Sequence, residues 1–171
     1  MSAPDEAPPP LGNPAVFQRI ATVLNGVQHV IVEHECALST AHASSLRGLQ
    51  THQAAKCMVL KLGKIFGVCV LAADRSMDNR AVRHLTGASK LRFARRDELW
   101  DLTGLVPGCV PPFGPPVLPW PLWIDRQLAD RVHSADRRLA FTPGVLNRSV
   151  VMDVGDWLDI VDGTVGEFSK A

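Results

Sequence analysis

Two apolar, β-branched runs separated by Gly63-Lys64 constrain the fold of this chain most strongly. The runs are residues 57–62 and 65–73. Two such runs joined by a two-residue turn that contains glycine predict an antiparallel β-hairpin. The second run is also the longest apolar stretch, and it is far shorter than the roughly 20 residues of a membrane-spanning helix. The sequence therefore predicts a globular fold built around a hairpin, with no membrane span.

Short helices and strands alternate irregularly around this hairpin. Asn13-Pro14 is typical of a helix start, and Asn25-Gly26 is typical of a helix end. The expected helical segments are 14–24, 39–48, 51–56, 78–85, 97–102 and 156–161, and the further expected strands are 27–33, 91–94, 122–124, 138–141 and 149–152. This mixture predicts the α+β class: a single domain with a mixed, curved or barrel-like β-sheet flanked by short helices.

Length and charge limit the function classes. A chain of 171 residues is expected to form one domain, with a flexible Pro-rich tail at 1–12, the domain at 13–165 and a C-terminal tail at 166–171. A net charge of +1 excludes a protein that coats nucleic acid, so RNA would have to meet a local patch. The N-terminus lacks the basic and apolar regions of a signal peptide, which indicates the cytoplasm.

The cysteines offer little chemistry in this sequence. They are scattered without a Cys-x-x-Cys pair, so we expect free thiols and no metal site; they are Cys36, Cys57, Cys69 and Cys109. The chain also lacks the Gly-x-Ser-x-Gly elbow, the phosphate-binding loop and the dinucleotide fingerprint.

Three features could carry function. Residues 103–114 form a loop rich in Pro and Gly that could hold backbone N–H groups against a ligand, or could simply connect two elements. Lys56 lies among apolar residues, where a lysine either extends its amine to solvent or is held for use. A basic stripe opposed only by Asp78 could contact phosphates or form a solvated face; it comprises Arg75, Arg80, Arg83, Lys90, Arg92, Arg95 and Arg96.

Taken in order, these segments resemble the YbaK-like, prolyl-tRNA synthetase-associated editing domains, from about residue 17 to residue 161. The matching blocks are 39–41, 53–59 with Lys56, 75–78, 103–104, 108–114, 123–125, 141–144 and 148–150. The resemblance implies a free-standing hydrolase that cleaves the ester between a wrong amino acid and tRNA. It also implies substrate-assisted attack, in which the terminal ribose hydroxyl helps and the protein supplies position and electrostatics.

The resemblance also implies roles for individual residues. Lys56 would orient the aminoacyl-adenosine end, and the backbone around Gly108 would donate N–H groups to the ester carbonyl. Many relatives carry glycine where this chain has Cys109, which leaves the size of the pocket open. The remaining implied contacts are Ser39, Thr40, Val110, Pro111, Pro112 and Thr142 for the substrate, and Arg80, Arg83, Arg92 and Arg95 for the tRNA.

The expected substrates carry a small amino acid of the Ala, Ser, Thr or Cys class, because a small pocket excludes larger side chains sterically. The expected partner is the aminoacylated acceptor end of tRNA, with an aminoacyl-tRNA synthetase as a second candidate. No cofactor, DNA or membrane is expected. The alternative reading is a non-catalytic tRNA- or protein-binding module that keeps the editing-domain fold, although retention of Lys56 and Gly108 argues against a decayed site.

Overall fold

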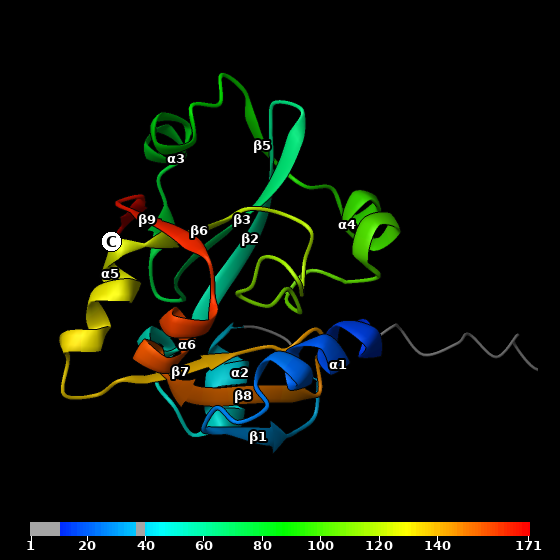
Figure 1. The fold of residues 1–171 in the computed structure, drawn as a ribbon, viewed down its shortest axis with the longest axis vertical. Coiled ribbons are helices and arrows are strands. Elements are labelled where there is room, and N and C mark those ends of the chain that lie inside the picture. Colours follow the sequence, from blue (N-terminus) through cyan, green and yellow to red (C-terminus); the bar gives the residue numbers. More distant parts are fainter. Residues whose placement is uncertain (1–10, 37–39) are drawn as a thin grey trace, which may run out of the picture.

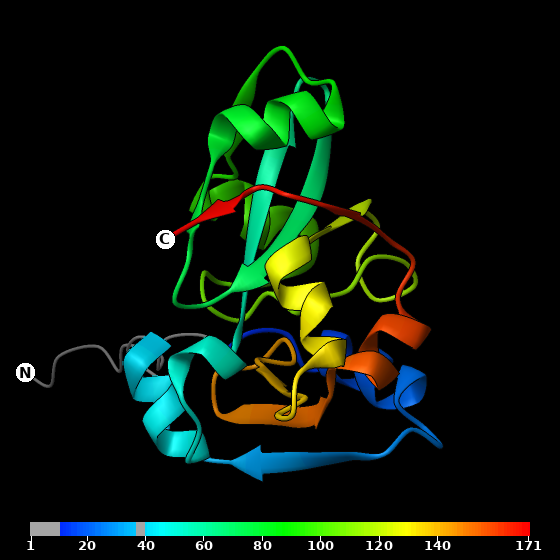
Figure 2. The same cartoon turned by 90° about the vertical axis from the view of Figure 1, so that its left-hand side faces the viewer.

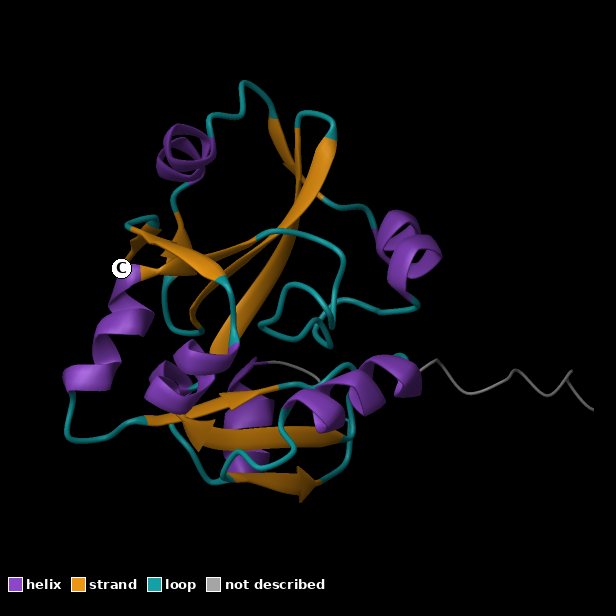
Figure 3. Ribbon diagram, in the orientation of Figure 1, coloured by secondary structure: helices purple, strands orange, loops and turns teal. Residues whose placement is uncertain are grey.

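The computed structural model describes residues 11–36 and 40–171. Its centre is a five-stranded mixed sheet (Figures 1 and 3). In spatial order its strands are β5 (Leu91–Phe93), β2 (Ala55–Leu62), β3 (Ile65–Ala72), β6 (Leu122–Asp125) and β9 (Gly163–Gly166). The hairpin predicted around Gly63-Lys64 is confirmed, because β2 and β3 pair antiparallel from Ala55 with Ala72 to Leu62 with Ile65. The β3–β6 and β6–β9 pairs are parallel.

A second, three-stranded antiparallel sheet forms the other half of the molecule. Its order is β1 (His29–Glu33), β8 (Arg148–Asp153) and β7 (Arg138–Phe141). Helix α1 (Pro14–Val23) and helix α2 (Thr40–Arg47) lie on opposite faces of this sheet (Figures 1 and 2). An isolated parallel bridge between Ala54 and Ala140 joins the start of β2 to β7, so the two sheets meet there.

The remaining elements are short. The helices are α3 (Asn79–Thr86), α4 (Arg96–Thr103), α5 (Arg126–Ala129) and α6 (Val154–Ile160), with 3-10 turns η1 (Thr51–Gln53) and η2 (Asp130–His133). A two-stranded sheet pairs β4 (Ser76–Met77) with β10 (Ser169–Lys170). In the described residues, no helix is long and apolar enough to cross a membrane.

Two apolar cores cover the two faces of the five-stranded sheet. The larger one lies toward the three-stranded sheet and includes Val59, Phe141 and Trp157, all buried. The smaller one lies under α3 and includes Leu60 and Phe168. Because successive strand residues point to opposite faces, Val59 and Leu60 of β2 enter different cores.

The predicted α+β class with a mixed sheet is confirmed, and the differences from the expected elements are local. The segment expected to be helical at 51–56 is a 3-10 turn that ends at Gln53, and β2 already begins at Ala55. Helix α5 was not predicted because it directly follows β6, with the Asp125 side chain as its N-cap. The sequence predicts tails at 1–12 and 166–171. Residues 1–10 lie outside the described residues, Gly12 bridges to Val145, and β10 with buried Phe168 packs the C-terminal segment into the fold.

Candidate functional site

The Pro- and Gly-rich loop after α4 turns sharply at Gly108. This residue is exposed and has φ +92°, a backbone conformation that favours glycine. The Cys109 N–H donates to the Val106 carbonyl over 3.2 Å. The N–H groups of Gly108 and Val110 have no hydrogen-bond partner among the described residues. The loop therefore offers two backbone donors beside an exposed turn.

Buried contacts hold this loop in place. The Cys109 side chain is fully buried, its Sγ lies 2.9 Å from the Val106 oxygen, and burial raises the pKa of the thiol to about 11. The Cys109 carbonyl accepts a 3.0 Å bond from the Gly144 N–H. The Pro112 carbonyl accepts a 3.0 Å bond from Trp157 Nε1. The Cys109 side chain thus packs into the core and does not fill the space in front of the loop.

Three of the expected substrate contacts lie behind the loop surface. Val110, Pro111 and Pro112 are all buried, and Val110 belongs to the larger core. Their side chains pack against the protein interior, so they act on the loop by fixing its backbone. Proline rings restrict φ and remove the N–H donor, which keeps such a backbone stiff.

Lys56 lies near the start of β2, half-buried, and its amine donates to the carbonyl of Arg75 in the turn after β3. Burial lowers the pKa of this amine, and nearby Asp74 opposes the shift. The neighbouring Cys57 packs against the larger core, whereas Met58 packs against the smaller one. Lys56 therefore points to the same face of β2 as Met58, and its one described hydrogen bond holds the turn at Arg75.

Thr142 follows β7 and belongs to a polar cluster that the sequence pattern does not predict. The Thr142 Oγ1 accepts a 3.1 Å bond from the guanidinium of Arg47, at the end of α2. The Arg47 Nε donates to Ser149 Oγ over 2.7 Å. His34 Nε2 also lies 2.7 Å from that hydroxyl oxygen. We call these four residues the Arg47 cluster.

The structure brings some of the predicted site residues together. Thr142 is two residues before Gly144, whose N–H bonds to Cys109, so the Arg47 cluster and the Gly108 loop are linked through one short segment. No hydrogen bond in the described structure joins Lys56 to either of them. Ser39 lies outside the described residues, and Thr40 is the first residue of α2.

The four arginines expected to bind tRNA are exposed on α3, β5 and the start of α4, and we call them the basic surface: Arg80, Arg83, Arg92 and Arg95. Two of them are paired with acids that follow the stripe in sequence. Arg92 makes a bidentate bond to Glu98, at 2.7 and 3.0 Å, and Arg95 lies 3.2 Å from Asp97. Arg80 and Arg83 form no ion pair with any described residue.

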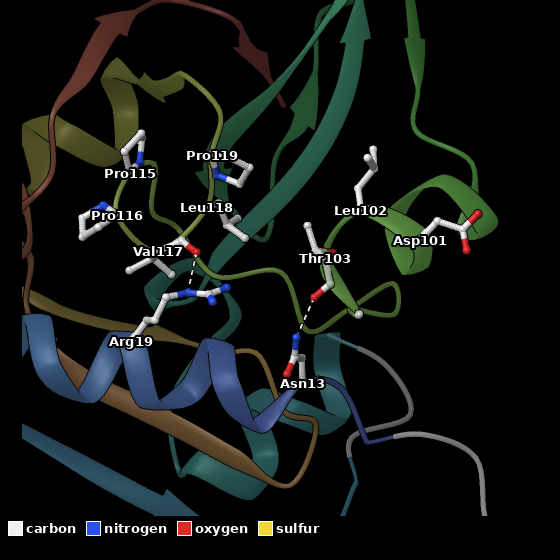
Figure 4. Close-up of a pocket in the computed structure, with 11 residues that line it drawn as sticks. Asn13, Arg19, Asp101, Leu102, Thr103, Pro115, Pro116, Val117, Leu118 and Pro119 are labelled. Atoms are coloured by element: carbon white, nitrogen blue, oxygen red, sulfur yellow. Dashed lines mark hydrogen bonds between the residues drawn. The ribbon is translucent and has the colours of Figure 1, made fainter.

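A separate groove of about 630 Å³ lies between α1, α4 and the Pro-rich loop (Figure 4). Arg19 on α1 donates to the Val117 carbonyl over 3.1 Å, and Asn13 donates to the Thr103 carbonyl over 2.8 Å. Of the predicted site residues that the structure describes, none lines this groove. Among the described residues, no group of three or more His, Cys, Asp or Glu side chains could hold a metal ion. The four cysteines are free, as predicted.

Comparisons with known proteins agree with this architecture. Residues 34–160 match the aminoacyl-tRNA editing domain family. The chain is 31% identical over 161 residues to the multifunctional Ser/Thr-tRNA deacylase ProXp-y of Escherichia coli K12, covering 90% of this chain and 92% of that protein. A relative from Escherichia coli O157:H7 with the same description shows the same identity and coverage.

Solved structures share the fold. The hypothetical protein APE2540 aligns with a TM-score of 0.76 at 21% identity, over 91% of this chain and 99% of that one. A candidate trans-editing enzyme for prolyl-tRNA synthetase aligns with a TM-score of 0.75 at 20% identity, over 91% and 98%. With the family match across most of the chain and the end-to-end similarity to a curated relative, this protein belongs to the aminoacyl-tRNA editing domain family.

Proposed function

We propose that this protein is a free-standing deacylase that hydrolyses tRNA mischarged with a small amino acid, with seryl- and threonyl-tRNA as its main substrates. The observation that carries this proposal is the 31% identity to a Ser/Thr-tRNA deacylase over nearly the full length of both chains. The unpaired N–H groups of Gly108 and Val110 support it, because ester hydrolysis needs donors for the carbonyl oxygen.

In the proposed reaction, water adds to the carbonyl carbon of the aminoacyl ester. The bond from that carbon to the ribose oxygen then breaks, and the ribose oxygen takes up a proton. The products are the free amino acid and tRNA with its terminal hydroxyl restored. An aminoacyl ester is already activated, so the terminal ribose hydroxyl can assist the attack and no protein nucleophile is required.

The protein residues bind and orient in this proposal. The Gly108 loop donates N–H groups to the oxygen on which negative charge develops. The Lys56 ammonium faces the phosphate or carbonyl oxygens of the aminoacyl-adenosine, once its amine has left the Arg75 carbonyl. The Thr142 hydroxyl oxygen accepts a hydrogen bond from Arg47, which leaves its O–H to donate to the substrate's side chain and a second lone pair to accept from the amino group.

Ser39 and Thr40 are proposed to line the amino-acid pocket, and the basic surface is proposed to contact acceptor-stem phosphates. Arg80 and Arg83 are the stronger candidates, because Arg92 and Arg95 already pair with acids. We place the reaction in the cytoplasm, where charged tRNA is used. An aminoacyl-tRNA synthetase is a second proposed partner, through which the deacylase would receive mischarged tRNA.

The test is a deacylation assay of the purified protein on a panel of tRNAs charged with Ala, Ser, Thr and Cys, with Phe as a large control. We expect rapid loss of Ser and Thr, slower loss of other small amino acids and spontaneous hydrolysis only for a large control such as Phe. If every aminoacyl-tRNA is hydrolysed at its uncatalysed rate while tRNA still binds, the chain is a binding module and the proposed activity is wrong.

A further inference from the structure

The Arg47 guanidinium has more donors than the protein uses. Arginine carries five N–H donors. Arg47 donates one N–H to Ser149 Oγ over 2.7 Å and one to Thr142 Oγ1 over 3.1 Å. The remaining N–H groups have no partner among the described residues. Arg47 is only half-buried, so its side chain is not closed off from solvent.

Arg47 has no counter-charge among the described residues. Within the described part of the chain, no carboxylate forms an ion pair with it, whereas Arg137 pairs with Asp153 at 2.7 Å and Arg138 pairs with Asp136 at 3.0 Å. Burial lowers the pKa of Arg47 to about 10, which leaves the guanidinium charged at neutral pH. A partly desolvated cation without an anion raises the free energy of the folded protein, and a bound anion offsets that cost.

A second observation on the same helix points to a ligand. Ser44 lies three residues before Arg47 on α2, so the two side chains share one helix face. Its side chain is 3% exposed, and its Oγ has no hydrogen-bond partner in the described structure. Buried hydroxyls are nearly always hydrogen-bonded in native proteins. The face of α2 that carries Arg47 therefore also carries a buried hydroxyl without a described hydrogen-bond partner.

We propose that Arg47 binds a phosphodiester of the terminal nucleotides of the substrate tRNA. This inference rests on the proposed function. The substrate's amino acid is esterified and has no free carboxylate, so the anions near the ester are the backbone phosphates. A guanidinium fork matches two phosphate oxygens. Thr142 holds the Arg47 guanidinium at one end of residues 142–144, and the Gly144 N–H at the other end bonds to Cys109, so this segment links the proposed phosphate site to the proposed ester site.

The test uses two non-hydrolysable probes with the amino acid joined by an amide. One is the 3′-seryl-amide of adenosine, without a phosphate, and the other is the same group on the dinucleotide cytidylyl-adenosine, with one phosphodiester. Calorimetry gives the Kd of each probe for the wild type, Arg47→Gln, Arg47→Lys and a control, Arg126→Gln. Arg126 is an exposed arginine on α5 that lies 3.7 Å from Glu167 and has no proposed role in binding.

We expect the wild type to bind the dinucleotide probe about tenfold or more tightly than the adenosine probe, as one charge-assisted contact provides. Arg47→Gln should lose that gain and bind the adenosine probe as the wild type does. Arg47→Lys, which keeps the charge without the fork, should lie between them. Arg126→Gln should match the wild type on both probes. Melting temperatures show whether each variant is folded. If Arg47→Gln does not fold, the binding of the two probes to Arg47→Lys decides whether Arg47 contacts the phosphate.

Three results would overturn the inference. Equal weakening of both probes by a folded Arg47 variant means that Arg47 acts on the amino-acid pocket through Thr142. Unchanged binding of both probes means that it lies outside the site. A wild type that binds both probes equally has no phosphate contact. In each case the deacylation assay on seryl-tRNA still decides the proposed function separately.

Discussion

Two arginine-containing regions of this molecule differ in how their charge is used. The Arg47 cluster is half-buried, and within the residues that the structure describes its guanidinium bonds to the hydroxyls of Ser149 and Thr142. The basic surface is exposed, and half of its arginines pair with the acids at the start of α4. Arg92 makes two bonds to Glu98 and, with the Arg95 N–H, lowers the pKa of that carboxyl to about 2, so the pair stays ionised at neutral pH.

This difference in burial and pairing suits the two groups of arginines to two different kinds of binding. A cation that is fixed by neighbours and partly removed from water acts strongly on one bound group, because screening by solvent is weak. An exposed arginine contributes a salt-dependent attraction to phosphates of any sequence. We therefore expect changes near Lys56, Gly108 and the Arg47 cluster to alter turnover or binding of the reacting end. Changes on the basic surface should alter affinity for the whole tRNA.

Lys56→Ala should have the largest effect and reduce deacylation by about 100-fold or more, since it removes the charge proposed to orient the reacting end. The measurement is the rate at saturating seryl-tRNA, with the melting temperature recorded in parallel. Lys61→Ala on the same strand is the matched control, because Lys61 lies over the Phe66 ring, 5.6 Å from its centroid, and has no proposed role. Near wild-type turnover of Lys56→Ala would remove Lys56 from the site. Loss of activity only in step with loss of folding would make it an anchor for the turn at Arg75.

Gly108→Ala should reduce the rate by about 100- to 1000-fold, as loss of an oxyanion donor does in other enzymes. The added Cβ would meet only Leu146 Cδ2 at 3.7 Å, an ordinary contact. The effect should therefore come from the φ of +92° that alanine disfavours, which would turn the N–H groups away.

Gly63→Ala provides the control for that strain. Gly63 has φ +65° in the β2–β3 turn, and nothing lies within 4 Å of the position that an added Cβ would take. Both variants should lose similar stability, but only Gly108→Ala should lose turnover. If Gly108→Ala keeps the same deacylation rate as Gly63→Ala, the Gly108 loop only connects two elements and has no catalytic role.

The sequence was sufficient for the features that depend on neighbours along the chain. The Gly63-Lys64 turn, the Asn13 cap and the Asp78 cap follow from local chemistry, and all three are present. Arg47 was missed because a single arginine at the end of a helix is the ordinary complement to the helix dipole. Its significance depends on Thr142 and Ser149, about a hundred residues away, at separations of 95 and 102.

The basic stripe shows the opposite error. Counting residues 75–96 finds one acid, yet Asp97 and Glu98 follow immediately, and the capping geometry at the start of α4 folds them back onto Arg95 and Arg92. A charge count that stops at residue 96 therefore overestimates the number of unpaired positive charges on this surface. Strand periodicity alone is enough to predict that Lys56 and Cys57 lie on opposite faces of β2.

The double variant Arg80→Gln, Arg83→Gln should weaken tRNA binding and leave turnover at saturating tRNA unchanged. Each lost phosphate contact should reduce the slope of log K against log salt by about 0.7–0.9. The measurement is a titration of uncharged tRNA at several salt concentrations, with Arg126→Gln as the control for charge loss elsewhere. Salt slopes identical to the wild type would identify α3 as a solvated face without a role in binding.

The smallest effect is expected for Arg92→Gln, below about twofold in tRNA affinity, because Glu98 already neutralises this arginine and bonds to both of its terminal nitrogens.

Glu98→Gln tests the same ion pair by removing the acid instead of the arginine. This variant leaves Arg92 without its anion and adds one unpaired positive charge to the basic surface. If Arg92 lies within reach of the acceptor stem, Glu98→Gln should tighten tRNA binding and steepen its salt dependence, and the double variant Arg92→Gln, Glu98→Gln should lose that gain. Equal affinities for all three variants and the wild type would place Arg92 beyond the tRNA and restrict the basic surface to α3. A large loss on Arg92→Gln alone would mean that the ion pair opens when tRNA binds, and that the two regions use their arginines in the same way.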